Sequence, residues 1–125
     1  MKTDVQTIII NNVEYVRADS ISSKPPAERI DGMPYVIIRT YSAGVFAGYL
    51  KSRQGKEVTL VRARRLWYWK GAASLSQLAM EGVKDPSACK FPCEVSQIEL
   101  TETIEVLSVT KQAQTCIEGV SIWKE

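Results

Sequence analysis

The residues best able to do chemistry in this chain lie in one basic and aromatic segment, residues 62–70. Within nine residues this segment carries four cations (Arg62, Arg64, Arg65 and Lys70) and three large rings (Trp67, Tyr68 and Trp69). A guanidinium group can hold a phosphate through two charged hydrogen bonds, each contributing about 1.5–3 kcal/mol. A ring stacked on a base contributes roughly 1–3 kcal/mol more. The segment therefore predicts a surface for an anionic and aromatic ligand, and a nucleotide has both properties.

Two interpretations of this segment remain open. As a single extended strand it would place Arg65, Trp67 and Trp69 on one face and the remaining cations on the other, and a bulge near Ala63 would exchange the partners. The alternative is structural, because tryptophans are most often core residues and arginines beside them often lie along the rings. Both interpretations predict guanidinium groups next to aromatic rings.

The rest of the composition argues against catalysis. The chain has no histidine, which excludes triads that need an imidazole base. Its three cysteines, Cys89, Cys93 and Cys116, are one ligand short of a structural zinc site and are expected to be reduced. Paired carboxylates at Glu99 and Glu102 are better explained as solvated strand faces. We expect a protein that is not an enzyme and has no cofactor, metal site or catalytic residue.

Length and charge limit the class of protein further. A chain of 125 residues with 45% hydrophobic content is the size and composition of one folded domain. The net charge of +2 is small for a protein that binds long nucleic acids. No apolar run approaches the roughly 20 residues that span a bilayer, and the first residues do not form a signal peptide. We therefore expect no membrane partner.

The elements that must position the basic segment are mostly strands. The expected fold class is α+β, an antiparallel β-sheet meander with two short helices, plus an N-terminal β-hairpin. Residues 1–30 are expected to form this hairpin and a linker, and residues 31–125 the ligand-binding domain. The alternation of apolar residues predicts strands at the following positions: 35–41, 45–51, 58–61 (with 66–69 continuing it or starting another), 94–100 and 103–109.

Two helices are predicted from their capping residues. Ser74 and Gln77 have the spacing of a capping box, and Gly82 stands where that helix would end. Thr110 is a candidate cap for a last short helix that ends at Gly119.

Two blocks of the sequence carry a resemblance to a known family. Residues 38–48 read IRTYSAGVFAG and residues 63–72 read ARRLWYWKGA; a later stretch, 73–106, contains LSQLA and KFP. Together they resemble the first family of Thoeris anti-defence proteins of tailed phages, often described as sponges. The resemblance covers about residues 35–123 and leaves the N-terminal hairpin outside.

The resemblance implies a function without catalysis in the host cytoplasm. Such proteins capture the cyclic ADP-ribose signal of a bacterial Toll/interleukin-receptor domain enzyme, hold it intact, and keep the Thoeris effector inactive. Some also bind cyclic di- or trinucleotides, which would extend the effect to CBASS. Members are homo-oligomers, dimers and in some cases hexamers, with ligand sites between subunits. The positions expected to contact ligand are Arg39, Arg64, Arg65, Trp67, Trp69, Phe91 and Thr101.

Three other functions compete with this one. The basic and aromatic segment could be a stacking platform for single-stranded nucleic acid, or a subunit contact of a virion structural protein. A hydrolase that destroys the signal is the third. Binding that weakens steeply with salt would identify the nucleic-acid binder. Loss of the oligomer on Arg65→Ala substitution would identify the virion protein, and a chemically altered ligand would identify the hydrolase.

Overall fold

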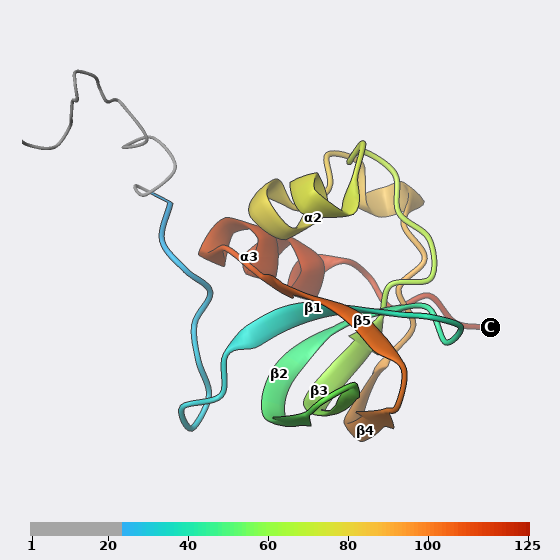
Figure 1. Ribbon diagram of the computed structural model, residues 1–125. Coiled ribbons are helices and arrows are strands. Elements are labelled where there is room, and N and C mark those ends of the chain that lie inside the picture. The colour runs from blue at the N-terminus through green and yellow to red at the C-terminus, as the bar shows by residue number, and fades with distance from the viewer. Residues whose placement is uncertain (1–23) are drawn as a thin grey trace, which may run out of the picture.

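The part of the chain that this computed structural model describes, residues 24–125, forms one antiparallel sheet and two short α-helices (Figure 1). The elements in chain order are β1 (Tyr35–Thr40), β2 (Val45–Gln54), β3 (Glu57–Arg65), α2 (Leu75–Glu81), a 3₁₀ turn η2 (Pro86–Ala88), β4 (Glu94–Leu100), β5 (Thr103–Ser108) and α3 (Lys111–Gly119). The strand order is β4-β3-β2-β1-β5. The predicted α+β class with an antiparallel sheet is confirmed.

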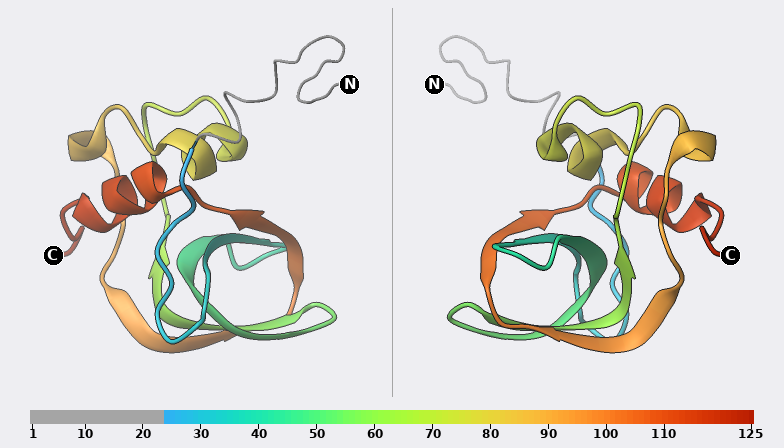
Figure 2. Two further views of the ribbon diagram at one scale, coloured as in Figure 1. Left: turned by 90° about the vertical axis from the view of Figure 1, so that its left-hand side faces the viewer. Right: turned by 90° about the vertical axis from the view of Figure 1, so that its right-hand side faces the viewer.

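The connection between β4 and β5 shapes the whole sheet. These strands lie at opposite edges of the sheet, yet only Thr101 and Glu102 join them. A two-residue link cannot cross three intervening strands, each about 4.8 Å from the next. The sheet therefore curls until its two edges approach one another at this end (Figure 2).

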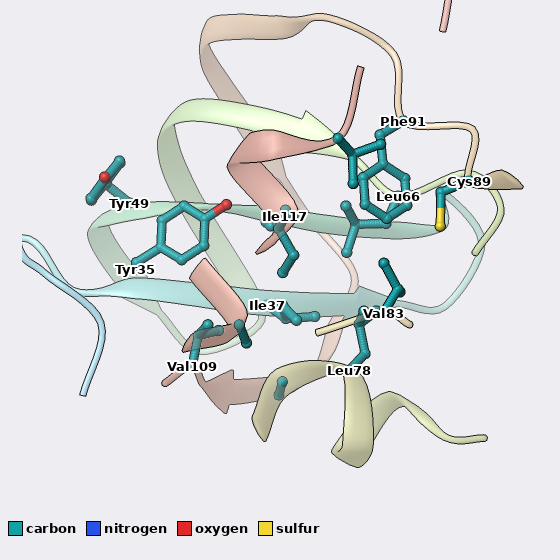
Figure 3. Close-up of a cluster of buried hydrophobic side chains, with 14 residues drawn as sticks. Tyr35, Ile37, Tyr49, Leu66, Leu78, Val83, Cys89, Phe91, Val109 and Ile117 are labelled. Atoms are coloured by element: carbon teal, nitrogen blue, oxygen red, sulfur yellow. The ribbon is translucent and has the colours of Figure 1, made fainter. Parts of the chain in front are cut away.

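Alternation along the strands creates two cores, one on each face of the curled sheet. Ile37 and Tyr49 face the helices and pack with Leu78 of α2 and Ile117 of α3 (Figure 3). The inner face of the curl is filled by a second group, which comprises Val36, Ile38, Phe46, Val58, Leu60, Ala63 and Leu100. The sheet is thus buried on both faces around β1 and β2, which makes it a firm support for the loops at its ends.

Both helices begin at the predicted caps. The Ser74 hydroxyl accepts a hydrogen bond from the Gln77 main-chain nitrogen at 3.1 Å, and the Thr110 hydroxyl accepts one from Ala113 at the same distance. Each cap satisfies a main-chain donor that the first helical turn leaves unpaired. Among residues 24–125, no helix is long and apolar enough to cross a bilayer.

The segment before β1 is docked on the helical side of the domain. The Ala27 nitrogen donates to the Val109 carbonyl at 2.9 Å, the Lys111 nitrogen donates to the Pro25 carbonyl at 3.0 Å, and Ile30 packs against the helix-facing core. The described part of the expected linker is therefore attached to the sheet and α3. The N-terminal hairpin, expected in the first part of residues 1–30, lies outside the described residues.

Candidate ligand-binding site

The basic and aromatic segment is not the single extended strand considered from its sequence. Strand β3 ends at Arg65, and it bulges at Arg62, whose φ is 52°. The register shows the extra residue, since Val61 pairs with Tyr49 but Arg64 pairs with Ala47. Two residues of β3 thus stand opposite one residue of β2, as in a β-bulge. Beyond the bulge the alternation is reversed, so that Arg64 points to the helix-facing side.

Gly48 is the residue of β2 that faces the bulge. A Cβ atom at this position would lie 3.0 Å from the Cα of Ala63 and 3.2 Å from the Val61 carbonyl oxygen. The bulge therefore depends on a residue without a side chain at this point of closest approach.

Arg64 is buried, and its guanidinium donates hydrogen bonds to main-chain carbonyl groups. Its Nε donates to the Pro92 carbonyl at 2.9 Å, Nη1 to the Ile117 carbonyl at 2.8 Å, and Nη2 to the Phe91 carbonyl at 3.0 Å. The guanidinium carbon also lies 5.5 Å from the centre of the Phe91 ring. Burial lowers the pKa of this arginine from its usual value, because desolvation disfavours the charged form.

Arg65 is placed on the other side of β3 and is open to solvent. Its guanidinium carbon lies 4.6 Å from the centre of the Phe46 ring, and no carboxylate of residues 24–125 forms a salt bridge with it. The side chain borders an apolar pocket of about 230 Å³, lined also by Phe46, Ala63, Pro92, Cys93, Val95 and Ile98. An exposed cation that has no salt bridge within the described part of the chain therefore lies at the edge of an apolar cavity.

Three rings and a lysine lie on the segments next to this pocket. Trp67 is 58% exposed and stacks on Trp123, with ring centres 5.1 Å apart and planes inclined by 12°. The Lys90 ammonium lies 5.4 Å from the Trp67 ring, 5.6 Å from Trp123 and 5.9 Å from Tyr68. We call these four residues (Trp67, Tyr68, Lys90 and Trp123) the aromatic surface.

Main-chain contacts bring the three segments of this surface together. Tyr68 and Lys90 exchange hydrogen bonds at 2.8 and 3.3 Å, and the Trp123 nitrogen donates to the Phe91 carbonyl at 3.0 Å. Arg65 and Trp67 are two residues apart, so their Cα atoms are separated by roughly 7 Å at most. The pocket and the aromatic surface are therefore adjacent.

The structure separates the other residues expected to contact ligand. Phe91 is fully buried in the helix-facing core and Trp69 packs partly against it. Arg39 lies on β1 and pairs with Glu105 of β5 at 2.7 Å. Thr101 lies in the β4–β5 connection, at the opposite end of β4 from Arg65, where it lines a polar pocket of about 490 Å³. Arg65 and Trp67 are both exposed and lie two residues apart, whereas Arg64 and Phe91 are buried on the helix-facing side.

Sequence reasoning missed Lys90 and Trp123 as members of the surface. Lys90 belongs to the KFP block, but Trp123 is an isolated aromatic residue near the chain end. Its only signal was its residue type, and a single tryptophan is as consistent with a core position as with a binding surface.

The cysteines are structural or exposed and do not cluster. The Cys89 thiol contacts main-chain atoms of Lys70 and Asp85, and burial raises its pKa. Cys116 contacts the main chain of Val83, and Cys93 is exposed at the apolar pocket. In the described part of the chain, no three metal-binding side chains come together.

The fold and this site define a small α+β domain with a cationic, aromatic surface beside an apolar pocket. The chain belongs to the DUF6948 family, a domain of unknown function whose model matches residues 33–117. Searches of curated proteins and of solved structures found no match. The family match includes Arg65, Trp67 and Lys90 and stops before Trp123.

Proposed function

We propose that this protein is a binding protein that captures a small nucleotide-type ligand without altering it. The observation that carries the proposal is the exposed Arg65 guanidinium, which has no salt bridge to any residue of 24–125, at the edge of an apolar pocket and two residues from Trp67, whose ring lies beside Lys90. An apolar pocket with one convergent charged group is a typical small-molecule site. A phosphate group would bind the cations, and a base would bind in the pocket or against the exposed part of the Trp67 ring.

The size of the pocket limits how the ligand sits. At about 230 Å³ the pocket is smaller than the roughly 300–1,000 Å³ of sites that enclose drug-sized ligands. It has room for one ring system, so the rest of a cyclic dinucleotide or cyclic ADP-ribose would lie over the aromatic surface. A second copy of the chain in a homo-oligomer could cover that remainder.

The specific ligand class in this proposal comes from the resemblance to Thoeris sponges. We propose a cyclic ADP-ribose isomer as the first ligand and cyclic di- or trinucleotides as further ones. Capture of such signals in the host cytoplasm would keep Thoeris or CBASS effectors inactive. Capture needs only tight binding and slow release, so it requires no acid–base group in the site.

Calorimetry tests binding and locates it. We expect heat of binding with a cyclic ADP-ribose isomer at micromolar protein, and a loss of about 1.5–3 kcal/mol of affinity, roughly 10- to 150-fold, for Arg65→Ala. Arg53→Ala is the matched control, because Arg53 is exposed on β2 beside the other, polar pocket. Equal losses for the two variants, or no heat with any cyclic nucleotide, would refute the proposal.

Two further measurements separate capture from its rivals. Mass spectrometry of the ligand released by heating should return it intact, whereas a hydrolase would release products. Bound ligand should also slow labelling of Cys93, which lines the pocket, and leave the reactivity of Cys116 unchanged.

Single-stranded nucleic acid is the second candidate, favoured by the exposed rings around Lys90. A gel shift with short oligonucleotides across a salt series distinguishes it. Binding that falls steeply with salt and exceeds that of the cyclic nucleotides would support this candidate and reject capture of a small ligand.

A further inference from the structure

We infer that Arg64 is a positioning residue: it holds the aromatic surface in place from beneath, through main-chain carbonyl groups, and does not touch the ligand. Arg64 is only 7% exposed. Its guanidinium lies where β3, the 89–93 loop and the end of α3 meet. The rings and the lysine of the surface are carried by these segments and their continuations. The part of the inference that concerns binding rests on the proposed function.

One carbonyl oxygen links Arg64 to the tryptophan pair. The Phe91 carbonyl accepts a hydrogen bond from Arg64 Nη2 and another from the Trp123 nitrogen, both at 3.0 Å. Trp123 then stacks on Trp67 with ring centres 5.1 Å apart. The orientation of this carbonyl therefore sets where the Trp123 ring can lie.

The other two donors fix the neighbouring segments. The bond from Nε to Pro92 holds the loop that lies between Lys90 and the pocket residue Cys93. The bond from Nη1 to Ile117 holds the last turn of α3, from which the chain continues to Trp123. A planar guanidinium can reach three acceptors in fixed directions, which the compact ammonium of a lysine cannot reproduce.

The β3 bulge is what makes this arrangement available. Without the extra residue at Arg62, the side chain of position 64 would point to the inner face of the sheet with Leu60. The two adjacent arginines thus have separate roles: Arg65 faces the ligand and Arg64 supports the segments around it.

The experiment uses the full chain with Arg64→Lys, which keeps the charge, and Arg64→Met, which keeps most of the length. Arg65→Lys is the matched control at the neighbouring exposed position. The first readout needs no ligand: the circular-dichroism couplet of the stacked Trp67–Trp123 pair, assigned with Trp123→Phe. The second is affinity for a cyclic ADP-ribose isomer, measured only on variants that keep the native far-ultraviolet spectrum and a cooperative melt.

We expect Arg64→Lys to fold, to lose the couplet, and to bind ligand about tenfold more weakly or worse, which is the size of the loss when a residue that orients the ligands of a metal site is removed. Arg65→Lys should keep the couplet. A folded Arg64→Lys protein with a native couplet and native affinity would overturn the inference. If Arg64→Lys loses the couplet but neither the native protein nor any variant binds cyclic nucleotides, the positioning role is upheld and only the proposed function is rejected.

If neither Arg64 variant folds, the unmodified protein gives the answer on heating. Because the guanidinium is part of the buried core, the couplet should disappear together with the sheet signal in one transition. Loss of the couplet well below the unfolding midpoint would overturn the inference, since the rings would then be held independently of Arg64.

Discussion

Replacing Phe91 should test whether this ring supports the fold or contacts the ligand. The side chain is fully buried in the helix-facing core and lies beneath the Arg64 guanidinium. Cutting a buried phenylalanine to alanine removes its transfer free energy and leaves a cavity, at a combined cost of about 3–5 kcal/mol. At about 4 °C per kcal/mol for a domain of this size, the melting temperature of Phe91→Ala should fall by about 12–20 °C.

Trp67→Ala is the comparison on the exposed side. Its ring is 58% exposed, and its main contact is the stack on Trp123, worth about 0.5–1.5 kcal/mol. The melting temperature should therefore fall by only about 2–6 °C. Ligand affinity should fall by about 1–3 kcal/mol, or roughly 5- to 150-fold, because a stacking partner is lost.

A conservative variant separates the two roles of a ring at position 91. Phe91→Leu keeps most of the volume and should cost less than about 1.5 kcal/mol, with ligand affinity unchanged. The assays are thermal melting followed by circular dichroism, and calorimetry on the folded variants. Phe91→Ala melting within about 5 °C of the native protein, or Phe91→Leu folding normally but losing the ligand, would refute the placement of Phe91 in the core.

Three further predictions concern backbone, alkaline stability and thiols. Gly71→Ala should lower the free energy of unfolding far more than Gly32→Ala in a denaturant titration. Both glycines have positive φ, but only at Gly71 would the new Cβ clash with a main-chain atom, the Lys84 nitrogen at 2.5 Å. Equal losses of about 1–2 kcal/mol would contradict this. Burial, followed by the charge of a nearby glutamate, raises the pKa of Tyr35, so the folded state favours the neutral phenol. The stabilisation of the folded state by the neutral phenol is present below the unfolded pKa of about 10 and is lost as pH rises above it. The melting temperature of Tyr35→Phe should therefore fall less with alkaline pH than that of the native protein, and identical falls would exclude the effect. Cys93 should react first with a maleimide in the native protein and Cys89 only on unfolding, as peptide mass spectrometry can determine; early labelling of Cys89 would contradict its burial.

Local signals in the sequence predicted most of the elements. Ser74 with Gln77, and Thr110, are caps whose partners lie three residues away, so neighbouring residues alone determine them. Strand positions around Ile37 followed from alternation between two buried faces. These features need no knowledge of distant contacts, and the sequence was sufficient for them.

The candidate site could be predicted only in part, because distant contacts decide it. The exposure of Arg65 and the burial of Arg64 depend on a bulge opposite Gly48; the sequence left a bulge near Ala63 open, but the alternation pattern could not decide between it and a straight strand. Trp123 joins Trp67 through a main-chain bond to Phe91, far away in the sequence. The sequence therefore indicated the segment that carries Arg65 and Trp67, while the placement of each residue within it depends on the packing of three segments.

The curled sheet also has a consequence for the order in which the protein folds. The hairpins β1–β2 and β2–β3 join neighbouring parts of the chain, whereas β1 pairs with β5 through contacts such as Ile38 with Val106. Such distant pairings slow folding, and sheets dominated by them fold in milliseconds to seconds. The 89–93 loop leads directly into β4, which pairs with β3, but the residues after α3 follow β5 in the chain, so we expect them to reach the end of β3 after this closure. In refolding experiments, the Trp67–Trp123 couplet should therefore appear in the last kinetic phase, after the hairpins have formed.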